Sequence, residues 1–192
     1  MNPTRRMGPS GSAIWNSMLD GAEDVLREEG YGALTSRKVA QRIGVKQRLV
    51  YYYFTTMDHL IVEAFKRLAA REIARLYEAT KSRHPVKNIW KVFAETADTR
   101  MVSEFMALAN RSKPLRREVK AFIQKTRKMQ VSALSDAMSG TKTVAGLPPD
   151  AAVIFATGAA LLLHREAAIG IRAGHAETLA VIRKFVAAHG QS

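Results

Sequence analysis

The sequence predicts an all-α protein. Apolar residues recur at three- and four-residue spacing through most of the chain, and no segment shows convincing alternation of apolar and polar side chains. The clearest example is 114–139, where Leu115, Val119, Phe122, Thr126, Met129 and Ala133 form one face. Glycine and proline residues separate the apolar segments, at positions where they end one helix or start the next. The expected class is therefore helical, with short connections.

The N-terminal third predicts an arm followed by three helices. Residues 1–11 contain two prolines and two glycines with little periodicity, which is typical of a flexible arm. Ser12 is a suitable N-cap for the first helix, and Gly30 is one of two glycines that end it. Two short helices are expected next, over about 35–43 and 47–54.

The rest of the chain predicts six longer helices. The helix after Asp150 is apolar nearly all round in its first half, which predicts burial on several sides. Its strongly apolar, uncharged stretch, 151–163, is 13 residues long, short of the ~18 residues that span a bilayer. The six expected helices cover about 58–80, 85–97, 101–110, 114–139, 151–172 and 176–189.

Composition excludes several classes of protein. The 192 residues include no cysteine, which rules out disulfide scaffolds, thiolate metal sites and cysteine nucleophiles. Arg5 and Arg6 are followed by no apolar segment, so the N-terminus is not a secretory signal. No paired carboxylates lie near a glycine-rich loop, and His59 with Glu63 lacks further metal ligands. We therefore expect a cytoplasmic protein that is not an enzyme and holds no cofactor or metal.

The net charge of +13 indicates a polyanionic partner, with nucleic acid first and an anionic membrane surface second. The charge is unevenly distributed. Residues 35–60 carry five basic side chains against one acidic, whereas 61–130 carry 17 against seven. Residues 1–34 have a net charge of −2. The largest basic excess therefore lies in the middle of the chain, over residues 61–130.

The segment 35–54, TSRKVAQRIGVKQRLVYYYF, predicts a helix-turn-helix unit whose second helix enters the DNA major groove. Gly44 permits the sharp turn between the two helices. Gln47 and Arg48 start the second helix, where Arg can pair with guanine and Gln with adenine. The alternative is a structural helical hairpin that binds no DNA, and three consecutive tyrosines argue against it. Hydroxyls of Tyr51, Tyr52, Thr35 and Ser36 can reach phosphates.

At these positions the chain resembles the TetR family of transcriptional repressors. The family pattern is a helix ending in Gly, then Thr-x-Arg-x-Ile/Leu-Ala-x-x-x-Gly-Val, a variable stretch, Tyr-x-Tyr/His-Phe, and a Leu shortly after. The resemblance covers about residues 12–66, and the remainder matches in architecture alone. The matching residues are Gly32, Thr35, Arg37, Val39, Ala40, Gly44, Val45, Tyr51, Tyr53, Phe54 and Leu60.

The resemblance implies a division into a flexible arm (1–11), a DNA-binding domain (12–57), a connecting helix (58–80) and a ligand-binding and dimerisation domain (81–192). Arg48 departs from the small residue common there, and Met57 from a phosphate-binding Lys. Base contacts are implied for 47–49, and phosphate or methyl contacts for 51–53. The residues expected at the DNA are Thr35, Ser36, Arg37, Lys46, Gln47, Arg48, Leu49, Tyr51, Tyr52 and Tyr53.

The resemblance also implies a homodimer that binds a near-palindromic operator and is released by a small-molecule effector acting through the connecting helix. A pocket lining is expected from Trp90, Phe93, Met101, Phe105, Met106, Phe122, Met129, Phe155 and His164, although plain core is an equal alternative for each. The last two helices are expected to pair between subunits. Candidate interface residues are Leu162, Arg165, Ile169, Leu179, Ile182 and Val186.

Eight basic residues fall within 111–128. A solvated helix face is the simpler interpretation, and a site for an anionic effector, such as a coenzyme A thioester, is the alternative. Two other classes of function stay open. One is a basic helical protein at anionic membrane surfaces, and the other is a helical ligand carrier or enzyme.

Overall fold

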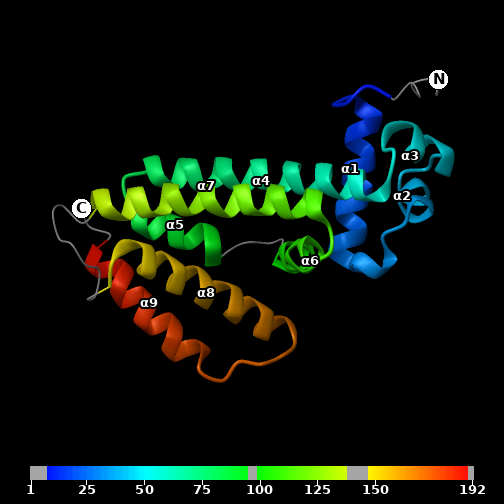
Figure 1. Ribbon diagram of the computed structural model, residues 1–192. Helices are drawn as coiled ribbons and strands as arrows, with labels where there is room; N and C mark the ends of the chain where they lie inside the picture. The colour runs from blue at the N-terminus through cyan, green and yellow to red at the C-terminus, as the bar shows by residue number, and fades with distance from the viewer. Residues whose placement is uncertain (1–7, 95–98, 138–146, 190–192) are drawn as a thin grey trace. The chain divides into compact units, whose positions relative to one another are not determined.

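The computed structural model describes residues 8–94, 99–137 and 147–189, and this part of the chain is almost entirely helical (Figure 1). The observed helices agree with the predicted segments, except that α8 ends at Ala168 and not at about residue 172, and that a 3-10 turn, η1 (Tyr31–Ala33), was not expected. The α-helices are α1 (Ala13–Glu28), α2 (Ser36–Arg42), α3 (Gln47–Tyr53), α4 (Met57–Lys81), α5 (Pro85–Ala94), α6 (Thr99–Ala109), α7 (Lys113–Ala137), α8 (Pro149–Ala168) and α9 (His175–His189).

The chain divides into two compact units. Unit 1 comprises residues 1–69 and 100–120, and unit 2 comprises 70–99 and 121–192. The helices α4 and α7 each contribute residues to both units. The chain therefore passes between the units within two helices, once in α4 and once in α7.

Unit 1 is built around α1. The Ser12 hydroxyl accepts a hydrogen bond from Trp15 N (3.3 Å) and caps the helix, as its sequence position predicts. The Trp15 ring lies 4.1 Å from the Phe54 ring between centroids, which joins the start of α1 to the end of α3. Further along, Phe65 of α4 packs edge-on against Phe105 of α6, with ring centroids 5.2 Å apart. Aromatic contacts thus link four of the helices in this unit.

A buried ion pair joins α1 to α4 within unit 1. Glu23 is 4% exposed, and its carboxylate accepts a hydrogen bond from Arg67 Nε at 2.8 Å. The same guanidinium contacts Asp20 at 2.8 Å and donates to the Asn16 carbonyl at 3.2 Å. Because a buried carboxylate is costly without a partner, Arg67 fixes where α4 can lie against α1.

Unit 2 is held by apolar packing. Helix α5 packs against α8 and α9, and α8 packs against α9. A cluster of buried residues, Val86, Leu134, Ala152 and Val153, joins α5, α7 and α8, and Phe185 packs against it from α9. The four helices therefore share one apolar core.

Helix α8 differs from its prediction in two ways. It ends at Ala168, short of residue 172, and Gly170 follows with a φ of +86° that a helix cannot continue through. Its burial is also smaller than expected: Ala152, Val153 and Ala160 are buried, whereas Phe155 is 66% exposed and Leu162 is 44% exposed. These apolar side chains of α8 are therefore exposed in the part of one chain that the structure describes.

In the described part of the chain, α8 is the one helix whose length and composition would allow it to cross a membrane, with a mean hydropathy of 1.3 over its best window. Only 17% of that window is buried. A single helix of this kind is weak evidence for a membrane span, since core helices of soluble proteins have the same composition.

Replacement of Arg67 by alanine should lower the free energy of unfolding by about 3 kcal/mol, because Glu23 is left buried without its main partner. The matched control is Arg75→Ala on the same helix, where Arg75 pairs at 3.0 Å with Glu72 and is 42% exposed. That change should cost below ~1 kcal/mol. Urea denaturation followed by circular dichroism measures both values, and equal losses would refute the structural role of the Glu23–Arg67 pair.

Candidate DNA-binding surface and apolar cavity

The connection between α2 and α3 is a tight turn. Thr35 caps α2 by accepting a hydrogen bond from Lys38 N at 3.1 Å, and Gly44 after the helix has a φ of +71°. This is a left-handed conformation that favours glycine. The Val45 N–H then donates to the Ala40 carbonyl at 2.9 Å. The turn orients α3 against α2, where Val39, Ala40 and Val50 are buried between the helices.

Helix α3 has one buried side and one exposed side. Val50 is 1% exposed and Phe54, its C-cap, is also 1% exposed. Leu49 is half-buried. The exposed positions follow the spacing of one helix face, and they are Lys46, Gln47, Arg48, Tyr51 and Tyr52.

Hydrogen bonds hold three of the expected DNA-binding side chains in fixed positions. Gln47 Nε2 donates to Ser36 Oγ at 2.8 Å, and Ser36 Oγ donates to Tyr51 Oη at 3.0 Å. Because Tyr51 Oη accepts this bond, its own proton is available to an outside acceptor such as a phosphate oxygen. Ser36 itself is 4% exposed, so it positions Gln47 and Tyr51.

The basic residues of α2 and α3 fall into two groups, and those of the first group, Lys38 and Arg42, form ion pairs with acidic residues at the end of α1. Lys38 contacts Glu29 at 2.9 Å, and Arg42 contacts Glu28 at 2.8 Å and Glu29 at 3.2 Å. The hydrogen bond from Lys38 is the main cause of a lowered pKa of the Glu29 carboxyl. The stabilisation linked to Glu29 is therefore present above its unfolded-state pKa and is lost as pH falls through the folded-state value.

The second group is Arg37, Lys46 and Arg48. All three are exposed, and no ion pair joins any of them to another residue in the described segments of the chain. Their charges are therefore available to an external anion. Lys46 and Arg48 lie at the start of α3, and Arg37 lies in the first turn of α2.

Tyr53 lies in the interior, contrary to the expected contact with DNA. It is 9% exposed, and its ring is edge-on to Trp15 at 6.5 Å and to Tyr52 at 5.2 Å. The Gly8 N–H donates to the Tyr52 carbonyl at 3.1 Å, and a Cβ at Gly8 would overlap the Tyr53 ring. Residues 8–11, expected to belong to the arm, thus begin at a buried glycine seated on the end of α3.

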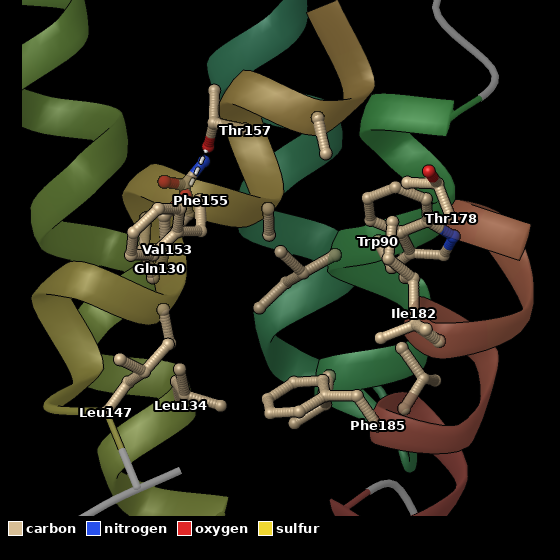
Figure 2. A pocket seen from close by; sticks show the side chains of 17 residues that line it. Trp90, Gln130, Leu134, Leu147, Val153, Phe155, Thr157, Thr178, Ile182 and Phe185 are labelled. Atoms are coloured by element: carbon tan, nitrogen blue, oxygen red, sulfur yellow. Dashed lines mark hydrogen bonds between the residues drawn. The ribbon is translucent and has the colours of Figure 1, made fainter. Parts of the chain in front are cut away.

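Unit 2 contains an apolar cavity of about 470 Å³ between α5, α7, α8 and α9 (Figure 2). This size falls in the range of small-molecule sites. Trp90 and Phe155 were expected there and do line it. Further lining residues are Val86, Ile89, Gln130, Leu134, Leu147, Ala152, Val153, Ala156, Thr157, Ala159, Thr178, Val181, Ile182, Phe185 and Val186.

Most of the other predicted pocket residues lie elsewhere. Met101 and Phe105 are fully buried in unit 1, because α6 belongs to that unit. The side chain of Phe93 lies outside the described residues. The half-buried residues Met106, Phe122, Met129 and His164 are not part of the lining.

The residues that line the cavity had one usable signal in the sequence. Gln130 and Leu134 are four apart on α7, so they share a face with the predicted apolar side of that helix. Ile182 and Val186 are likewise four apart on α9, but their spacing does not tell which element covers them. Ile182 and Val186, expected in the dimer interface, line the cavity because α9 turns this side towards α5.

Comparison with known proteins identifies unit 1. Residues 18–64 match the family described as bacterial regulatory proteins, tetR family. The N-terminal part of the chain is thus similar to the TetR family. The match covers α1 to the first turns of α4, which includes the turn at Gly44 and the exposed side of α3. The family therefore assigns the helix-turn-helix to DNA binding and transcription regulation.

The curated relative is the fatty acid metabolism regulator protein of Bacillus subtilis (strain 168), 29% identical over 70 residues. The matched segment spans 36% of this chain and 36% of that relative, so the similarity concerns one part of each protein. This likeness assigns no activity to the present chain.

Solved structures share the fold over most of the chain. A putative TetR-family regulator from Rhodococcus sp. has a TM-score of 0.71 with 17% identity, over 91% of this chain and 97% of that one. A putative regulator from Saccharomonospora viridis, solved in complex with choline, has a TM-score of 0.73 with 12% identity, over 82% of this chain and 86% of that one. At these identities the likeness shows the all-α fold.

The basic residues of 111–128 do not contribute to the cavity lining. All eight are exposed along α7 and the turn before it, and none lines the cavity. Arg116 donates through Nε to the Ala109 carbonyl at 2.9 Å, which satisfies the end of α6. The solvated-face interpretation fits this placement.

Replacement of Gly8 by alanine should destabilise the DNA-binding unit by about 1–3 kcal/mol, because the added methyl group overpacks the buried Tyr53 ring. The control is Gly32→Ala, where a Cβ meets nothing within 4 Å. Chemical denaturation of the two variants and the parent gives the comparison. A Gly8→Ala variant as stable as Gly32→Ala would show that the contact with Tyr53 is not held in solution.

Proposed function

We propose that this protein is a cytoplasmic, ligand-responsive repressor that binds a near-palindromic operator as a homodimer. The main support for this proposal is the exposed side of α3, which presents Gln47, Arg48, Tyr51 and Tyr52. The nearby basic residues Lys46 and Arg48 form no ion pair with another residue in the described part of the chain. An α-helix of this kind fits the major groove of B-DNA.

Each side chain on this surface has a distinct proposed role. Arg48 reads guanine through its two parallel N–H groups, and Gln47 keeps its amide oxygen for a base edge while its nitrogen is bonded to Ser36. Tyr51 and Tyr52 donate to phosphates, and Arg37 and Lys46 contribute charge. Thr35 and Leu49 lie beside them as secondary contacts. Tyr53 and Ser36 are buried, so they support the neighbouring side chains and do not themselves contact DNA.

The dimer is proposed to form through the uncovered apolar sides of α8 and α9. Leu162 is 44% exposed, Ile169 is 71% exposed and Val181 is 68% exposed. Exposed apolar groups in this number favour a protein interface. Arg165 is exposed and Leu179 half-buried, which suits the edge of such an interface. A second copy explains the exposed α8 side better than a membrane does, because the other side of α8 packs in a folded unit.

A symmetric dimer is proposed to place two α3 helices in major grooves ~34 Å apart or a multiple of that distance. Helix α3 has seven residues, which corresponds to only ~10 Å of length. One copy therefore touches few bases, and specific affinity requires two. A small molecule in the cavity is proposed to weaken operator binding through α4 and α7, with a coupling of ~1–3 kcal/mol.

Replacement of Arg48 by alanine should relax base preference at one step of the operator and cost about 1–3 kcal/mol there. Tyr51→Phe should weaken operator and random DNA alike, because it removes a phosphate contact. Operators selected from a random library, followed by fluorescence anisotropy on selected and scrambled DNA, separate the two effects. Arg183→Ala, an exposed cation of α9, is the control. Equal losses on both DNAs for Arg48→Ala would exclude its base-reading role.

Replacement of Leu162 by glutamate should raise the dimer dissociation constant at least tenfold, because a charge is buried at the interface. Gln124→Glu, on an exposed position of α7, adds the same charge and should leave association unchanged. Sedimentation equilibrium measures both variants. Dimerisation of Leu162→Glu at the parental strength would place the interface elsewhere.

A further inference from the structure

The cavity of unit 2 is lined by uncharged side chains, although α7, one of the helices that form it, is strongly basic. Of its 17 lining residues, Gln130, Thr157 and Thr178 carry amide or hydroxyl groups and Trp90 carries an indole N–H, and no Lys, Arg, His, Asp or Glu from the described segments is present. Trp90 and Phe185 supply aromatic surface. An ionised ligand group would lose its hydration here with no opposite charge to replace it.

The two threonines offer little donor capacity. Thr157 Oγ1 donates to the Val153 carbonyl at 2.8 Å, and Thr178 Oγ1 donates to the Gly174 carbonyl at 2.8 Å. Each hydroxyl proton is therefore used by its own helix, and only acceptor lone pairs remain.

Gln130 is the lining side chain that can both donate hydrogen bonds to a ligand and accept them from it. Its side chain is in a residue 4% exposed, it lines the cavity, and no hydrogen bond joins its amide to another residue that the structure describes. Figure 2 shows Gln130 with Thr157 and Phe155 on one wall of the cavity, facing Ile182 and Phe185 on the other. A ligand group that both donates and accepts would match this amide.

We infer that the effector is an uncharged amphiphile, with an apolar body packed between Trp90, Phe155 and Phe185 and one hydroxyl or amide group bonded to Gln130. This inference rests on the proposed function in taking the cavity as the effector site. The volume of about 470 Å³ corresponds to ~15 non-hydrogen atoms, at ~30 Å³ for each water-sized group. An anionic effector held by the basic residues of 111–128 is thereby disfavoured, since none of them faces this cavity.

The test compares three ligands that share one chain and differ in head-group charge: 1-dodecanol, dodecanoate and dodecyltrimethylammonium. Binding to the full-length protein is measured below micelle-forming concentrations by calorimetry and by thermal shift at pH 8. We expect 1-dodecanol to bind at least tenfold more tightly than either ion. Dodecanoate affinity should rise as pH falls, because the neutral acid is the form that enters.

Two variants locate the polar contact. Gln130→Leu should weaken 1-dodecanol binding about five- to tenfold and reduce its advantage over dodecanoate. Gln124→Leu lies on the exposed side of the same helix and should leave both affinities unchanged. If Gln130→Leu fails to fold, the comparison of the three ligands on the parent protein still decides the head-group charge.

Equal or tighter binding of dodecanoate, or a preference for dodecyltrimethylammonium, would overturn the inference. So would failure of 1-dodecanol to bind. Neither readout involves DNA, so loss of the proposed operator binding is detected separately, by anisotropy without ligand. A protein that binds DNA but no 1-dodecanol, or 1-dodecanol but no DNA, distinguishes failure of the one proposal from failure of the other.

Discussion

The buried carboxylate of Glu23 constrains the DNA-binding unit more than any other single group. It lies in the middle of α1, where it requires a cation, and Arg67 of α4 supplies one. Because breaking a buried pair is far more costly than breaking an exposed one, the start of α4 is fixed against α1. The same helix α1 carries Glu28 and Glu29 at its end, which hold α2 through Arg42. Helix α1 thus positions both α2, the first helix of the helix-turn-helix, and α4.

This arrangement explains why residues 1–60, which contain the helix-turn-helix, carry only eight basic side chains against six acidic ones. The acidic residues of α1 neutralise the cations of α2 that point towards it, while Arg48 and the basic residues near it stay unpaired within the described segments. Affinity for DNA depends on cations that can reach phosphates and bases. The total charge of +13 therefore says little about where the DNA binds.

The same distinction applies to the effector cavity. The basic residues of α7 dominate the composition of the middle of the chain, yet they lie on the solvent side of the helix. The side of α7 that faces the cavity presents Gln130 and Leu134. A ligand responds to the groups that face it at short range, since exposed charges further away are screened by water and salt. Helix α7 can therefore be strongly basic and still contribute to a neutral site.

The sequence alone determined the helices and the DNA-reading segment, because both depend on local patterns: apolar spacing, the caps at Ser12 and Thr35, and the glycine at the turn between α2 and α3. Tertiary structure decided which side of each helix is covered. It placed Tyr53 in the core, since Gly8 and Trp15 pack on its ring, and it placed Phe105 in unit 1 beside Phe65. It also brought Gln130 and Ile182, 52 positions apart, to one cavity. Such contacts follow from packing between helices distant in sequence, which no local pattern encodes.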